Sequence, residues 1–128
     1  MNVSDNIKQF KGALLKKSNI FFVFLILLIF FLDRISKIKV LKDFNESTYY
    51  VSDVLNIELI WNTGIGFGLF STQAPILYNL ITLLIGIVII ALYYVLIISE
   101  KIDKLIYSII IGGALGNFYD RLIFKAVP

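Results

Sequence analysis

Long apolar runs, broken by short polar segments, organise the chain. Apolar residues extend from Ile20 to Leu32, no charged residue occurs from Leu59 to Ser99, and a further apolar run begins at Leu105. A helix that crosses a membrane needs about 20 predominantly apolar residues, so the uncharged stretch is about twice as long as one span requires. Its first part contains three glycines and ends at "STQAP", which is typical of an irregular or β-structured segment. The pattern predicts three transmembrane helices, at residues 19–40, 74–99 and 105–124.

The segments between these helices differ in charge, and the difference predicts the orientation of the chain in a membrane. Residues 1–18 contain four lysines against one aspartate, whereas residues 42–58 contain one lysine against four carboxylates. Because positively charged segments stay in the cytoplasm, the N-terminus is predicted to be cytoplasmic. The remaining segments are then a β-rich outer loop at 41–73, a cytoplasmic turn at 100–104 and the start of a second outer loop at 125–128.

The lysine-rich start followed by an apolar run also describes a secretory signal peptide. No small-residue cleavage site follows the run, however, and the chain continues with the charged residues Asp33, Arg34 and Lys37. The first apolar run is therefore interpreted as a transmembrane helix.

Composition places the chain among membrane proteins and limits its chemistry. Hydrophobic residues make up 59% of the sequence, above the roughly 45–50% of soluble domains. The absence of cysteine and histidine excludes disulfides, thiolate catalysis and the commonest metal ligands and bases. The formal net charge of +3 equals that of the N-terminal lysine cluster, so membrane orientation explains it better than nucleic-acid binding does.

Polar residues within the first and third predicted helices form two groups. Asp33 and Lys37 are four residues apart, so they share a helix face and can form an ion pair. Asn117 precedes Asp120 by three residues and Arg121 by four, so all three can turn toward one side of the third helix.

Glycines mark two further groups. Gly112 and Gly116 form a G-x-x-x-G step, which lets another helix approach closely. In "WNTGIGFG", Asn62 precedes Gly64 and two further alternating glycines, which free the backbone to curve and to expose its N–H groups. This spacing is not the dinucleotide-binding pattern G-x-G-x-x-G, so nucleotide binding is not predicted.

Each group also has a purely structural interpretation, as an interfacial ion pair with a snorkelling lysine, a helix-packing step or hydrogen bonds between helix ends. A functional interpretation starts from Asp33 and Asp120, the only carboxylates expected within or at the end of a span. They could share a proton and activate water, as in aspartic proteases. They could equally serve a small proton-coupled carrier or tie together a non-catalytic bundle subunit, and the residues alone leave these alternatives open.

Three motifs together resemble those of one protein family. "GGALGNFYDRL" resembles the signature G-G-A-x-G-N-x-x-D-R of lipoprotein signal peptidase, the bacterial signal peptidase II. "NTGIGFGLF" resembles the N-x-G-x-x-F block of that family, and "DRISK" resembles its D-x-x-x-K motif. Their order and spacing agree with the family from about Asn19 onward.

The resemblance implies an all-α integral membrane protein with three of an expected four transmembrane helices and a small β-structured cradle on the outer face. The implied activity is that of an aspartic endopeptidase in the bacterial inner membrane. It would remove signal peptides from diacylglyceryl-modified prolipoproteins by cutting before the lipobox cysteine. The implied partners are this substrate and membrane lipids, without nucleic acid, metal or cofactor, and a monomer is expected.

The resemblance also assigns roles to individual residues. The residues matching positions that line the substrate site are Asn62, Asn117 and Arg121, and those matching supporting positions are Asp33, Lys37, Gly64 and Asp120. The family's first catalytic aspartate would fall at position 129, one residue past Pro128, and the second at the start of a fourth helix. We therefore expect an N-terminal fragment that lacks the catalytic pair and does not cleave substrate alone.

Overall fold

The computed structural model describes residues 12, 17–44, 49–65, 69–71 and 74–128. Within these residues lie three long helices and one short hairpin, in the order α2 (Lys17–Asp43), β1 (Tyr49–Ser52), β2 (Leu55–Ile57), α3 (Pro75–Ile98) and α4 (Lys101–Phe124). The predicted cytoplasmic segment 1–18 falls almost wholly outside the described residues. The architecture is mostly helical with a small β element, as the sequence predicts.

The helices match the predicted apolar runs, but the boundary predicted for the third helix is wrong. Helix α4 begins at Lys101, so the predicted turn at 100–104 is instead mostly the first turn of the helix. The chain reverses at Ser99 and Glu100, whose backbones are extended with ψ of 169°. The Lys104 N–H already donates to the Glu100 carbonyl at 2.9 Å. Lysine is a good helix former, and aspartate is stabilising in the first turn of a helix. The polarity of "EKIDK" was therefore not enough to predict a non-helical connection.

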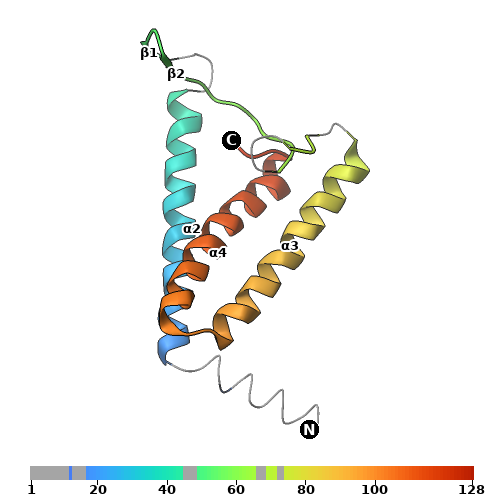
Figure 1. The fold of residues 1–128 in the computed structure, drawn as a ribbon. Helices are drawn as coiled ribbons and strands as arrows, with labels where there is room; N and C mark the ends of the chain where they lie inside the picture. Colours follow the sequence, from blue (N-terminus) through green and yellow to red (C-terminus); the bar gives the residue numbers. More distant parts are fainter. Residues whose placement is uncertain (1–11, 13–16, 45–48, 66–68, 72–73) are drawn as a thin grey trace.

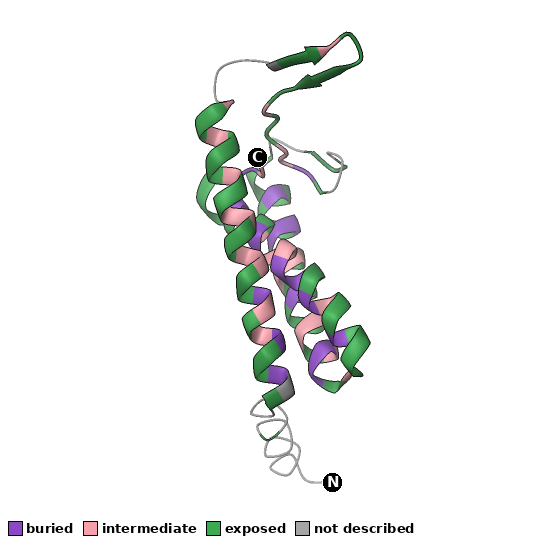
Figure 2. Cartoon of the chain, turned by 90° about the vertical axis from the view of Figure 1, so that its left-hand side faces the viewer, coloured by how far each residue is buried: buried purple, intermediate pink, exposed green. Residues whose placement is uncertain are grey.

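Two helices in the described part of the chain are long and apolar enough to cross a membrane, Asn19–Asp43 within α2 and Pro75–Ile98 in α3. Large apolar side chains of both helices, such as Phe24 and Ile90, are exposed, which suits contact with lipid. Figure 2 shows exposed positions along the whole length of the helices. Helix α4 has the same length as α3 but carries charged residues near both ends. A third span and a four-helix bundle therefore stay predictions.

Helix α4 packs against both other long helices, so it forms the centre of the bundle (Figure 1). The buried core draws on all three helices, with Phe22 and Ile26 from α2, Leu96 and Ile97 from α3, and Ile111 from α4. Because α4 contributes to both interfaces, the direction of each of its side chains decides which neighbour that side chain meets.

Two glycines let α2 approach α4 closely. A Cβ atom at Gly112 would lie 2.7 Å from the Cβ of Ile29, and a Cβ atom at Gly116 would overlap the carboxylate of Asp33. Ile29 and Asp33 are four residues apart on α2, as Gly112 and Gly116 are on α4. The two pairs therefore pack against each other over one helical turn. This confirms the prediction that the G-x-x-x-G step admits a neighbouring helix.

The β element is a small antiparallel hairpin between α2 and α3. Tyr49 pairs with Ile57 and Tyr50 with Asn56, with an irregularity between Tyr50 and Ser52. The Tyr50 hydroxyl donates a hydrogen bond to the Asp53 carboxylate, which raises the pKa of the Tyr50 phenol above its usual value. A β-structured segment within residues 41–73 is thus confirmed, while its location on the outer face stays a prediction.

The glycine contacts predict different effects for substitutions at Gly116 and Gly113. Gly116→Ala should lower the free energy of unfolding in detergent by about 1–3 kcal/mol, because the new methyl group forces the helices apart. Gly113→Ala is the matched control, since no atom of a neighbouring element lies within 4 Å of its Cβ position. It should leave stability unchanged or raise it by up to about 1 kcal/mol. Equal effects in a denaturant titration followed by circular dichroism would contradict the close packing.

Candidate functional site

Four charged side chains, Asp33, Arg34 and Lys37 from α2 and Asp120 from α4, form one ion cluster between the two helices. The three residues of α2 lie within five consecutive positions, so a single stretch of that helix supplies both cations. Formally, the two carboxylates balance the guanidinium and the ammonium. The ion cluster therefore joins α2 to α4 without adding net charge.

Asp120 is the centre of the ion cluster and has a relative exposure of 0%. The Arg34 guanidinium binds both of its carboxylate oxygens, through Nη1 to Oδ1 and through Nη2 to Oδ2, the latter at 2.8 Å. The Lys37 ammonium donates to the same Oδ2 at 2.7 Å. Such bidentate, charge-assisted contacts fix geometry as well as adding energy. They hold the last turn of α4 against α2.

Asp33 completes the ion cluster from within α2. Its Oδ2 lies 2.8 Å from Arg34 Nη2 and 3.2 Å from Lys37 Nζ, and the latter contact confirms the predicted Asp33–Lys37 pair. Among the described hydrogen bonds, none links Asp33 directly to Asp120. The two carboxylates are bridged through cations, so this geometry does not favour the hypothesis that they share a proton and activate water.

Arg34 is the functional candidate that the sequence analysis missed. Adjacent helical residues point about 100° apart, so Arg34 was not expected on the face of Asp33 and Lys37. Its long side chain reaches Asp120 nevertheless, and its guanidinium carbon lies 4.9 Å from the centre of the Tyr119 ring. One feature of the sequence could have identified Arg34. A charged residue beside an apolar run is costly in a membrane, so it is expected to have an oppositely charged partner whichever helix face it occupies.

Asn117 lies at the rim of the ion cluster. Its Oδ1 accepts a hydrogen bond from Lys37 Nζ at 2.7 Å, while the residue itself is exposed. Lys37 thus bridges Asn117 and Asp120, which are three residues apart on α4. The two residues share the α2-facing side of the helix, as their spacing predicts.

Arg121 points away from the ion cluster, so the expectation that it shares one side with Asn117 and Asp120 is wrong. Its guanidinium carbon lies 5.6 Å from the centre of the Tyr78 ring of α3, and the Tyr78 hydroxyl donates to the Arg121 carbonyl at 2.9 Å. Arg121 is 3% exposed, and its Nη1 has no hydrogen-bond partner. Because α4 lies between α2 and α3, consecutive residues can contact different helices. Asp120 contacts α2, whereas Arg121 contacts α3.

A cavity of about 270 Å³ lies beside Arg121, between α3 and α4. The residues that line it are Tyr78, Asn79, Thr82, Leu83, Phe118, Arg121, Leu122 and Lys125. The lining combines two cations with amide and hydroxyl groups and contains no carboxylate. The cavity can therefore offer hydrogen-bond donors to a carbonyl or an anion.

Asn62 and Gly64 belong neither to the ion cluster nor to the lining of the cavity beside Arg121. The Asn62 side chain accepts a hydrogen bond from the Gly64 N–H at 2.8 Å and donates to the Ile65 carbonyl at 2.7 Å, which closes a tight turn. The Asn62 backbone exchanges two hydrogen bonds of 2.8 Å with Val127, just after α4. The structure thus ties this turn to the end of α4 rather than to the ion cluster. Gly66 and Gly68 of the same motif fall outside the described residues.

The acidic residues do not gather into a metal site in the part of the chain that the structure describes. No group of three or more histidine, cysteine, aspartate or glutamate residues is close enough to hold a metal ion there.

The comparisons with known proteins all point to the same family. Residues 25–128 match the family described as "Signal peptidase (SPase) II". The chain is 44% identical over 107 residues to a lipoprotein signal peptidase of Pelagibacter ubique, covering 81% of this chain and 64% of the relative. It is 35% identical over 114 residues to that of Anaplasma marginale, covering 87% of this chain and 66% of the relative. No solved structure matches the chain.

The ion cluster predicts that Asp120 contributes strongly to stability. Asp120→Asn should lower the free energy of unfolding by about 3–5 kcal/mol, because it leaves two cations facing a single carboxylate in a buried setting. Asp43→Asn, at the exposed end of α2, is the control and should change stability by less than about 0.5 kcal/mol. Denaturant titration in detergent measures both values. A small effect at position 120 would show that the ion cluster does not hold the helices together.

Proposed function

This chain belongs to the signal peptidase II family, and on that premise we propose that it is the substrate-holding part of a membrane aspartic endopeptidase. Its substrate is a prolipoprotein whose lipobox cysteine carries diacylglycerol, and the bond cut is the one before that cysteine. The two apolar helices and the family together indicate a membrane-integral bacterial protein. The chain spans about two thirds of the length of its first relatives, so the proposed activity is that of a longer protein.

The observation that carries the proposal is the way the ion cluster holds the end of α4. Arg34 and Lys37 hold Asp120 from α2. One turn apart on α4, Asn117 contacts α2 through Lys37, whereas Arg121 contacts Tyr78 of α3. A helix end fixed in this way presents its neighbouring side chains in a constant direction. Asp33, Lys37 and Asp120 are therefore positioning residues in this proposal, and Arg34 joins them.

Arg121 is the residue best suited to bind substrate. Its guanidinium is buried beside the cavity between α3 and α4, and Nη1 keeps an unused donor. A buried donor without a partner is costly, and a substrate carbonyl oxygen would satisfy it. Asn117 offers an exposed amide one turn before Arg121, and Asn62 approaches the end of α4 through its pairing with Val127.

The catalytic carboxylates in this proposal lie beyond Pro128. Asp33 and Asp120 are each bound by Arg34 and Lys37, so neither is free to activate water against the other. The same ion pairs do not distinguish the peptidase from a proton-coupled carrier or from a non-catalytic bundle subunit. The peptidase interpretation alone is supported by the family.

The membrane arrangement completes the proposal. The N-terminus lies in the cytoplasm, α2 and α3 cross the inner membrane, and α4 crosses it as a third span. The end of α4, with the ion cluster, then lies at the outer face, where a secreted prolipoprotein arrives. The longer protein acts as a monomer with a fourth helix.

Substitution of Arg121 tests substrate binding in a chain that extends past Pro128. Arg121→Gln should lower kcat/KM for a diacylglyceryl prolipoprotein by tenfold or more, or about 1.4 kcal/mol in the transition state, mainly through KM. Arg121→Lys should restore part of the loss, since it keeps the charge but not the planar fork. Lys42→Gln, on the exposed last turn of α2, is the control. Unchanged kinetics of Arg121→Gln would refute the assigned role.

The chain of 128 residues also makes a direct test of where catalysis occurs. We expect no cleavage of a lipidated prolipoprotein by the purified chain, because its membrane carboxylates are held in ion pairs. The measurement is the appearance of the mature lipoprotein over time. Cleavage by the purified chain would place catalysis within these 128 residues and would overturn this assignment.

A further inference from the structure

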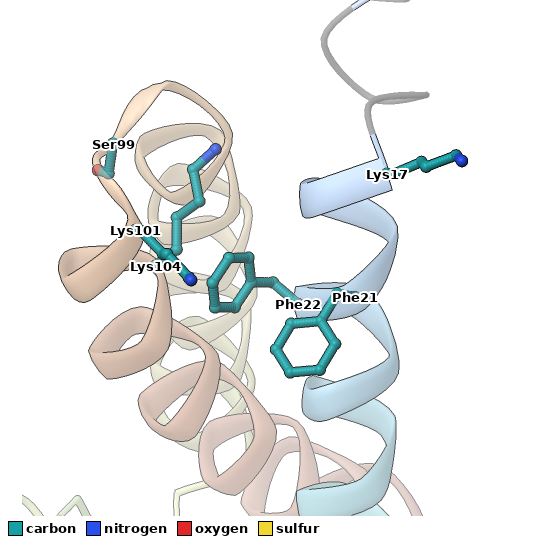
Figure 3. A pocket seen from close by; sticks show the side chains of 6 residues that line it. All are labelled: Lys17, Phe21, Phe22, Ser99, Lys101 and Lys104. Atoms are coloured by element: carbon teal, nitrogen blue, oxygen red, sulfur yellow. The ribbon is translucent and has the colours of Figure 1, made fainter.

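A second and larger pocket lies at the opposite end of the bundle, where the start of α2 faces the turn between α3 and α4 (Figure 3). Its volume is about 540 Å³, within the range of ordinary ligand sites. The residues that line it are Lys17, Phe21, Phe22, Ser99, Lys101 and Lys104. Half of the lining is therefore lysine, and no carboxylate belongs to it.

Lys104 is the unusual member of this lining, because its ammonium is buried without a carboxylate. The residue is 8% exposed, and its Nζ donates to Asn19 Oδ1 at 2.5 Å and to the Ile97 carbonyl at 3.0 Å. Both acceptors are neutral. In the described part of the chain, every ion pair belongs to the ion cluster at the other end of α2. A buried cation without a counter-charge is costly, and a bound anion would offset that cost.

Further positive charge surrounds Lys104. Lys101 begins α4 and lines the pocket, so the positive end of the helix dipole also lies in this region. Glu100 and Asp103 lie on the same turn but are exposed and do not line the pocket. Lys17 extends away from the gap in Figure 3 and adds charge at the edge rather than inside.

The other wall of the pocket is aromatic and belongs to an apolar helix. Phe22 is 3% exposed and part of the core, whereas Phe21 is 58% exposed beside it. Both residues lie near the start of the helix segment that is long and apolar enough to cross a membrane. The pocket thus combines a cationic side with an apolar side at one end of a helix segment that is apolar enough to cross a membrane. A soluble anion would use only the cationic side.

We propose that this pocket binds the headgroup phosphate of an anionic phospholipid, with an acyl chain lying along Phe21 and the outer face of α2. Basic pockets between helices at a membrane surface bind anionic headgroups in this way. Lys104 and Lys101 bind the phosphate, and Phe22 forms the floor of the pocket. The proposal is independent of the peptidase activity, because the pocket lies at the opposite end of α2 from the ion cluster.

The test measures lipid binding to the purified chain in a neutral detergent by native mass spectrometry. Phosphatidylglycerol and phosphatidylcholine with identical acyl chains are titrated separately. We expect one phosphatidylglycerol per chain at saturation and at least tenfold weaker binding of phosphatidylcholine. Lys101→Gln, at an exposed position that does not threaten folding, should weaken phosphatidylglycerol binding about fivefold. Lys104→Gln should weaken it further, and Lys42→Gln at the other end of α2 should not change it.

Three results would overturn the proposal. The first is equal binding of the two lipids, and the second is phosphatidylglycerol binding that neither pocket variant weakens. The third is displacement of phosphatidylglycerol by inorganic phosphate at comparable concentration, which would identify the occupant as a soluble anion. If Lys104→Gln fails to fold, the comparison of Lys101→Gln with Lys42→Gln still decides the question.

Discussion

The bonds from Arg34 and Lys37 of α2 to Asp120 of α4 are the interaction on which the rest of the structure depends. Asp120 is completely buried and receives three bonds from these two cations. Helix α4 packs against both other helices. Bonds that fix the end of α4 therefore also fix the directions of the neighbouring side chains on it. The buried carboxylate is tolerated because its two partners come from one stretch of the neighbouring helix.

Close packing makes this interaction possible. Gly116 leaves the space that the Asp33 carboxylate occupies, and Gly112 leaves the space for Ile29 one turn earlier. The polar contact and the glycine contact are therefore two parts of one interface. Beyond it, Arg121 turns toward Tyr78 and the cavity beside α3, so the ion cluster and the proposed substrate-binding residue lie on different sides of α4.

The sequence predicted the features that depend on local spacing. The helices, the Asp33–Lys37 pair and the glycine step all follow from three- and four-residue spacings or from apolar run length. It did not predict features that depend on which neighbour a side chain meets. Arg34 reaches Asp120 only because its side chain is long, Arg121 faces α3 only because α4 is central, and Lys104 is buried only because its turn is helical from Lys101. Helical periodicity gives a face but not the helix that covers it.

A double-mutant cycle between Arg34 and Asp120 tests the central claim most directly. The free energy of unfolding in detergent is measured for the parent chain, Arg34→Gln, Asp120→Asn and the double variant, which isolates the coupling between the two side chains. We expect a favourable coupling energy of at least about 1.5 kcal/mol, because each single variant removes one of the two oppositely charged partners of the remaining side chain. A coupling energy within about 0.5 kcal/mol of zero would contradict it, since the two residues would then contribute independently.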